Sequence, residues 1–112
     1  MKLTEILSGD TRKEGVEQEI QVWLKRIPVF SKYEDKDVPF DKIETAMWKL
    51  LAKYDHSVSG MFMSKPTAPT RYYSCSVWKD GGREFVMALY GATIYELFAK
   101  VVLLCYAKRP KE

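Results

Sequence analysis

The fold is decided between Arg71 and Tyr106, where the sequence reads RYYSCSVWKDGGREFVMALYGATIYELFAKVVLLCY. We expect a strand over 71–79, a tight turn at Gly81-Gly82 and a second strand over 83–90. Glycines tolerate the positive φ angles that such a hairpin turn demands. A nearly all-apolar helix follows Gly91. The segment therefore predicts an antiparallel hairpin that is followed directly by a helix.

The register of this hairpin follows from its turn. With Gly81-Gly82 as the central pair, the residues opposite one another are Lys79–Glu84, Trp78–Phe85, Val77–Val86 and Cys75–Ala88. This register pairs opposite charges and sets apolar side chains against apolar ones. A turn centred on Asp80-Gly81 would instead place Val77 against Glu84. The side-chain pairing therefore favours the Gly-Gly turn.

The residues around the hairpin complete the body of the protein, residues 39–109. An amphipathic helix is predicted from about Phe40 to Tyr54, because apolar residues recur there at helical spacing and lysines occupy the opposite side. The segment 58–64 is typical of a further strand. Two prolines after it rule out continued pairing. The last helix begins with the capping-box sequence Thr93-Ile94-Tyr95-Glu96.

Residues 1–27 form a predicted helical arm. A one-turn apolar stripe, Leu3, Ile6 and Leu7, precedes Gly9. A second capping box at 11–14 then starts a longer amphipathic helix, which Pro28 should end. Residues 28–38 show no clear period, and 31–37 are polar and charged, so we expect an exposed connection over 28–38. The sequence thus predicts one α+β domain over 1–112, in which helices pack with a three-stranded antiparallel sheet in the order α-β-β-β-α after the arm.

Two surfaces of this fold need covering. The last helix is apolar nearly all round, so either other elements of the chain enclose it or it forms a homodimer interface. The predicted sheet has no polar face either, and we expect both faces to be covered. The aromatic residues of the face that carries Trp78 are then core residues or a binding surface. In the second case its main residues are Arg71, Tyr72, Trp78, Lys79 and Arg83, since aromatic and Arg side chains dominate interface energetics.

Composition limits the class of protein. The 112 residues are 46% hydrophobic and 29% charged, which is typical of a globular chain rather than a disordered one. Eighteen basic residues are nearly matched by fifteen acidic ones, so the dense positive charge of a dedicated nucleic-acid binder is missing. No apolar run reaches the roughly 20 residues of a membrane helix. We expect no signal peptide, and buried thiols at Cys75 and Cys105 in a reducing cytoplasm.

Residues that could support catalysis are few. His56 is the only histidine, and a general base needs a positioned partner and a pocket. Cys75 lies in the middle of a predicted strand, where a buried structural thiol is expected rather than a nucleophile. One histidine with two distant cysteines does not form a metal site. We therefore expect neither an enzyme nor a protein that holds a cofactor or a metal.

The α-β-β-β-α order resembles the double-stranded-RNA-binding domain. That family grips phosphates with a lysine cluster at the start of its last helix. The matching positions here, Thr93 to Leu97, hold an acid and bulky apolar groups instead. From the shared order of elements, the resemblance implies the layout of the fold. As an alternative function, it implies RNA binding.

The segment from Glu84 to Thr93, continued through Ala107, resembles small phage proteins of the phage ABA sandwich type. Their C-terminal pattern is a strand, a small-residue turn with a threonine, and a terminal helix rich in Ala and Leu. This resemblance implies a virus or a mobile element as the source. It also implies a host protein as the partner, in the host cytoplasm, and a role in anti-defence or host takeover.

The sequence leaves three functions open. The first is a non-catalytic protein-interaction module, for example an inhibitor that occupies a host factor. The second is a nucleic-acid binder that uses its Arg and Lys residues on phosphates and Tyr72 or Trp78 for base stacking. The third is a small-molecule-binding protein with a pocket near His56, Tyr73 and Cys75.

Overall fold

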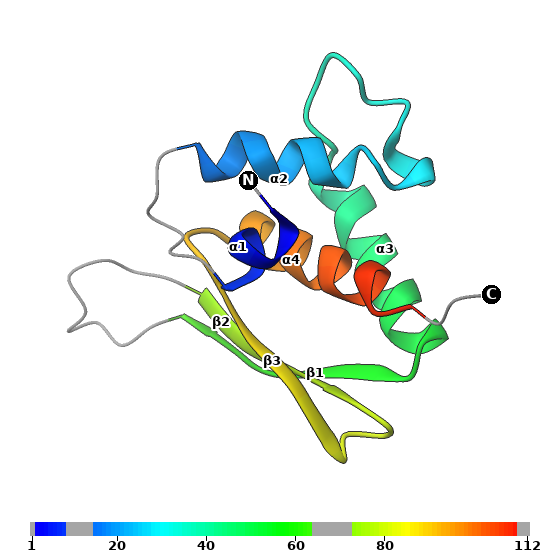
Figure 1. Cartoon of the computed structure of the whole chain (residues 1–112), viewed down its shortest axis with the longest axis vertical. Helices are drawn as coiled ribbons and strands as arrows, with labels where there is room; N and C mark the ends of the chain where they lie inside the picture. Colours follow the sequence, from blue (N-terminus) through cyan, green and yellow to red (C-terminus); the bar gives the residue numbers. More distant parts are fainter. Residues whose placement is uncertain (1, 9–14, 64–72, 110–112) are drawn as a thin grey trace.

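The computed structural model describes residues 2–8, 15–63 and 73–109. In chain order these residues form α1 (Leu3–Ser8), α2 (Val16–Leu24), the 3-10 turn η1 (Pro28–Phe30), α3 (Phe40–Lys53), β1 (His56–Met63), β2 (Tyr73–Lys79), β3 (Glu84–Gly91) and α4 (Ile94–Ala107) (Figure 1). The strands form one antiparallel sheet in the order β1-β2-β3. The predicted α+β class, with helices packed on a three-stranded antiparallel sheet, is confirmed.

The helix boundaries follow local sequence. Thr93 caps α4, because its Oγ1 accepts a hydrogen bond of 3.1 Å from the N–H of Glu96. The Glu96 carboxylate accepts in turn from the N–H of Ala92, one residue before the cap. These two contacts form the predicted capping box at 93–96 nearly as the sequence indicates. Helix α3 ends at Lys53, one residue before its predicted end at Tyr54.

Helix α2 is shorter than predicted. It ends at Leu24, four residues before Pro28, and Ile27 adopts an extended conformation. Proline disfavours the helical conformation in the residue before it, which explains why the chain leaves the helix early. Val16, Ile20 and Leu24 are buried on one face of α2, as their spacing predicts. The predicted capping box at 11–14 lies outside the described residues.

The hairpin register is right near the turn and wrong beyond it. Lys79 faces Glu84 and Trp78 faces Phe85, as predicted. Val77 then faces Met87 rather than Val86, because β3 holds one extra residue there. A β-bulge of this kind increases the local twist and moves every later residue by one position. The predicted pair Cys75–Ala88 is therefore wrong, and Cys75 faces Leu89.

A second bulge interrupts β1. The pairing with β2 changes register between Ser59 and Phe62, and Gly60 has a φ of +66° in this interval. Glycine adopts this left-handed conformation without steric cost, so it is the residue suited to the bulge. The strict alternation of faces predicted for residues 58–64 is therefore broken at this point.

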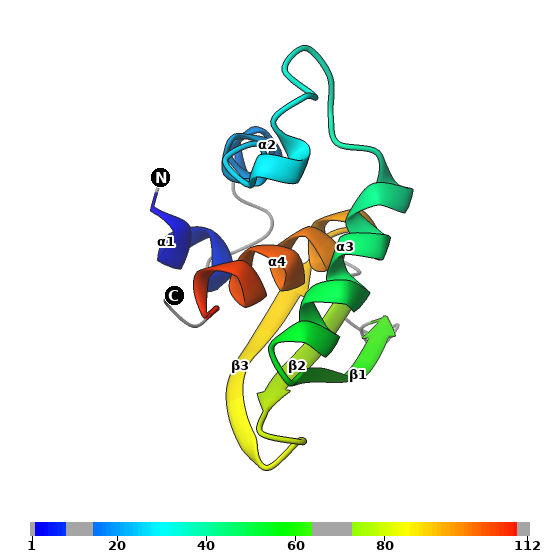
Figure 2. The same cartoon turned by 90° about the vertical axis from the view of Figure 1, so that its right-hand side faces the viewer.

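All four helices that the structure describes lie on one side of the sheet (Figures 1 and 2). Helix α4 occupies the middle and packs against β2, β3 and the other three helices. Every residue from 96 to 105 is buried as a result. Of the two predictions for α4, enclosure by the same chain is correct. The homodimer seam is wrong, because Val102 and Leu103 are already buried within one chain.

The opposite sheet face is not covered by any helix of the described residues. Its pairing places four serines there, at 57, 59, 74 and 76, together with Trp78, Phe85 and Tyr90. Phe85 and Tyr90 are about half exposed. Coverage of both faces by the described elements of this chain is therefore wrong. The serines allow this face to meet water, as is common in antiparallel sheets.

The connection over 28–38 is less exposed than predicted. Phe30, Tyr33 and Val38 are buried in the core, while the charged residues between them face solvent. Three apolar anchors separated by polar residues therefore hold this segment against the body of the protein. Its position defines one wall of the site described next.

Candidate functional site

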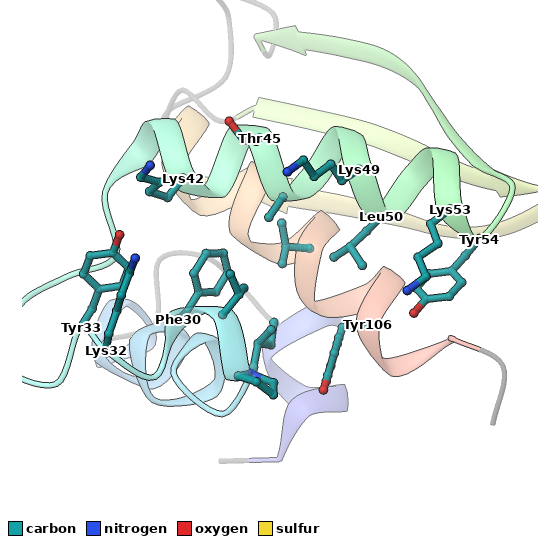
Figure 3. A pocket seen from close by; sticks show the side chains of 15 residues that line it. Phe30, Lys32, Tyr33, Lys42, Thr45, Lys49, Leu50, Lys53, Tyr54 and Tyr106 are labelled. Atoms are coloured by element: carbon teal, nitrogen blue, oxygen red, sulfur yellow. The ribbon is translucent and has the colours of Figure 1, made fainter. Parts of the chain in front are cut away.

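A groove of about 580 Å³ runs between α3 and the segment that contains η1 (Figure 3). Its apolar lining includes Phe30, Ala46, Leu50 and Val102, from η1, α3 and α4. Four lysines also line it: Lys32, Lys42, Lys49 and Lys53. We call this feature the lysine-rimmed groove. Its volume lies within the roughly 300–1,000 Å³ that ligand sites usually occupy.

Three of these lysines form a row along α3. Lys42, Lys49 and Lys53 are spaced by seven and four residues, which places them on one stripe of the helix. The row extends over about 16 Å, since each helical residue rises about 1.5 Å. In Figure 3, Leu50 and Lys53 extend from α3 toward the groove, and Lys42 and Lys49 lie along the helix itself. A row of cations therefore runs beside the apolar lining.

Tyrosines accompany the cations at the ends of the groove. The Nζ of Lys32 lies 5.4 Å from the ring centroid of Tyr33, and that of Lys53 lies 5.4 Å from the ring of Tyr54. At the α4 end, the guanidinium of Arg109 lies 3.7 Å from the ring of Tyr106. Cations attract the faces of aromatic rings. These contacts hold the charged groups at the rim while the rings add apolar surface.

The charge of this groove is of one sign. No aspartate or glutamate is among the lining residues that the structure describes. Asp41 and Glu44 on α3 are exposed but are not part of the lining. Like charges along a low-dielectric wall add to one field. The groove therefore attracts an anionic ligand that also carries apolar groups.

A hydrogen-bond network holds the segment that forms the far wall. The Tyr95 hydroxyl donates to the carbonyl of Val38 (2.6 Å) and accepts from Nε2 of Gln21 (2.6 Å). The N–H of Val38 donates to Oε1 of Gln21 (3.1 Å). Three elements, α2, the connection and α4, are thus joined by one closed set of bonds. This network fixes where the connection reaches α3.

A buried ion pair lies in α4, away from this groove. Lys100 is wholly buried, and its Nζ donates to the carbonyl of Tyr90 (2.7 Å) and lies 4.0 Å from Oε1 of Glu96. Burial raises the pKa of Glu96, while the Ala92 N–H and the Lys100 charge oppose the shift. Glu96 also borders a smaller cavity of about 320 Å³, which is lined by Glu17 and Asp37 as well.

The binding residues predicted from the sequence do not form one surface. Trp78 lies on the uncovered sheet face. The centroid of its ring is 5.3 Å from that of Phe85, and its Nε1 donates a hydrogen bond to Oγ of Ser59 (2.9 Å). Lys79 is the next residue of the strand and points to the opposite face, where it pairs with Glu84 at 3.5 Å. Arg83 is exposed in the turn. Arg71 and Tyr72 lie outside the described residues.

The pocket predicted near His56, Tyr73 and Cys75 does not form from these residues. His56 pairs with Lys79 at one end of β2, whereas Tyr73 lies six residues away, about 20 Å along the strand. Cys75 is buried in the core, and this burial raises the pKa of its thiol to about 11. Burial likewise raises the pKa of Cys105 to about 12. These thiols are therefore poor nucleophiles near neutral pH.

Two kinds of feature would bear on function in the described part of the chain, metal-binding groups and membrane-spanning helices. No three His, Cys, Asp or Glu side chains are grouped there so that they could hold a metal ion. None of the helices described is both long and apolar enough to cross a membrane. Comparison with known proteins finds no matching family model, no matching curated protein and no matching solved structure.

The lysine-rimmed groove was not predicted from the sequence. The signal was present, since Lys42, Lys49 and Lys53 recur on the polar side of an amphipathic helix. A row of lysines on such a helix is typical of any solvated face, and only the segment packed opposite makes it a rim. That segment was expected to be an exposed connection, so no opposing wall could be predicted.

Proposed function

We propose that this protein is a non-catalytic protein-interaction module that binds an acidic partner in the lysine-rimmed groove. One observation carries the proposal: four lysines surround an apolar lining that contains no acidic side chain among the described residues. Apolar contact supplies affinity in such a site, and charge complementarity supplies specificity and a faster association rate.

The non-catalytic part of the proposal is supported by the placement of the candidate residues. His56, Tyr73 and Cys75 do not converge, and the two thiols have raised pKa values. A module of this kind acts by occupying a surface of its partner. The resemblance to phage ABA sandwich proteins would make that partner a host protein and the module an inhibitor of a host defence factor.

The test is a pull-down from a bacterial lysate, with and without nuclease, using three forms of the tagged protein. These are the wild type, the variant K42E/K49E/K53E and the control Arg83→Glu. Arg83 is an exposed cation in the β2–β3 turn and is not part of the groove lining. We expect a stoichiometric protein that survives nuclease, is retained by Arg83→Glu and is lost with the lysine variant.

Other outcomes would contradict the proposal. If the captured molecules are lost on nuclease treatment, the protein-interaction proposal is contradicted and nucleic-acid binding is favoured instead. The affinity of nucleic-acid binding falls steeply with salt. A partner that the lysine variant retains, and that a Trp78→Ala variant loses, would move the site to the uncovered sheet face. All the substituted lysines and Arg83 are exposed, so these variants should fold like the wild type.

A further inference from the structure

We propose, building on the function above, that the segment bound in the lysine-rimmed groove is an acidic amphipathic helix of about three turns. Its apolar stripe would contact Leu50 and Ala46, which are partly exposed, and Val29, which is exposed. Its acidic side chains would pair with the lysines of α3. This inference depends on the groove being the binding site, and it specifies the secondary structure and the pattern of the partner.

The spacing of the cations carries the first step. Lys42, Lys49 and Lys53 repeat at seven and four residues along one stripe of α3. A second α-helix that lies alongside α3 has the same rise of about 1.5 Å per residue. Acidic residues at matching intervals of four and seven on its near face would therefore meet all three lysines together. An extended peptide rises about 3.3 Å per residue and would meet them in a different pattern.

The distribution of charge argues against a fatty acid. A fatty acid has one carboxylate, which a single lysine satisfies, whereas these three cations are spread over about 16 Å of helix. Lys32 adds a fourth cation from the connection. A ligand that uses all of them needs several anions along its length. A short run of Asp and Glu on one helix face meets this requirement.

The apolar lining argues for a protein helix rather than a nucleic acid. Leu50 and Ala46 line the same groove as the lysines of α3 and the residues of η1, and both are partly exposed. Val29 on η1 extends the apolar surface toward solvent, with 62% of its side chain exposed. Helix-in-groove recognition uses apolar anchors spaced by three, four and seven residues. A nucleic acid meets a cationic surface mainly through its phosphates, which pair with lysines but not with an aliphatic lining.

The experiment is fluorescence anisotropy with the full chain and synthetic peptides of about 14 residues, which span about four turns. The first peptide has a leucine stripe with Glu beside it. Three others have the same length: one with the residue order scrambled, one with a central proline, and one with Lys in place of each Glu. Laurate and a single-stranded oligonucleotide are tested as competitors. Circular dichroism follows helix formation in the bound peptide.

We expect the first peptide to bind and to gain helix, and its affinity to fall with salt. The scrambled and proline peptides should bind about tenfold more weakly or worse, and the Lys peptide should not bind. Lys49→Glu should weaken binding by about tenfold, and so should Val29→Glu, while Arg83→Glu leaves it unchanged. Both groove positions are exposed, so folding is not at risk.

Two kinds of failure can be told apart. Equal binding of the scrambled and proline peptides would overturn the helical partner but leave the acidic-partner function standing. Failure of every acidic peptide would overturn both the helix and the function proposed above. Displacement of a bound peptide by laurate, or by the oligonucleotide at equal concentration, would also overturn both, in favour of that ligand.

Discussion

Lys100 and Glu96 lie one turn apart on α4, with 4.0 Å between the ammonium nitrogen and Oε1 of the carboxylate, and both are excluded from solvent. Residues 96–105 of α4 are all buried, so both charges lie inside the body of the protein. Breaking such a pair is costly because the remaining charge stays buried without compensation.

Lys100→Met should therefore destabilise the protein by about 3–5 kcal/mol. The substitution removes the counter-ion of the Glu96 carboxylate and the donor to the carbonyl of Tyr90. The double variant Glu96→Gln/Lys100→Met should lose less than the sum of the two single variants. Urea unfolding of all four proteins measures this coupling, and strict additivity would show that the two charges do not interact.

The raised pKa of Glu96 predicts a pH dependence of stability. Its folded pKa lies above the unfolded value near 4.5, so the folded state binds this proton more tightly. Stability is therefore lost as the pH rises from the unfolded pKa through the folded pKa, and it is regained as the pH falls back to the unfolded value. Lys100, Glu17 and the Ala92 N–H are the groups that adjust the shift.

Glu96→Gln should remove this contribution. The measurement is the free energy of unfolding of the wild type and the variant across pH 4.5–8. Relative to the variant, the wild type should gain stability on acidification. A difference between the two proteins that is constant with pH would contradict the prediction, and it would show that Glu96 titrates at its ordinary value.

Tyr95→Phe should destabilise the protein by about 1–3 kcal/mol, because the Val38 carbonyl and the Gln21 amide each lose their bond to the hydroxyl. The connection would also be held less firmly, so peptide affinity in the groove should fall in the same variant. For the stability measurement Tyr54→Phe is the matched control, since no hydrogen bond of its hydroxyl is found among the described residues. Equal stability of the two variants would show that the network contributes nothing.

Gly91→Ala should destabilise the protein by at least ~2 kcal/mol through overpacking. A Cβ at position 91 would lie 2.6 Å from the backbone nitrogen of Leu97, in the first turn of α4. Gly81→Ala is the control for the same chemical change. No atom lies within 4 Å of its added Cβ, and its φ of +66° should cost only about 1 kcal/mol. Thermal unfolding that ranks the two the other way would contradict this packing argument.

The sequence alone predicted the fold class and most element boundaries. The reason is that these features depend on local patterns: the period of α3, the Thr93 cap and the glycines of the β2–β3 turn. The pairs Lys79–Glu84 and Trp78–Phe85 lie within a few residues of that turn, so the turn determines them. The apolar run of α4 correctly required that this helix be covered on several sides.

Tertiary structure alone decided the rest. The bulge at Val86 depends on the twist that the whole sheet needs, and it changed which residues share a face. All four helices of the described residues pack on one side of the sheet, which left Trp78 on the uncovered face. The groove needs α3 and η1 to meet, and the buried side chains of Phe30, Tyr33 and Val38 bring them together. Contacts between segments far apart in the chain leave no local period, and for that reason sequence patterns alone could not predict this site.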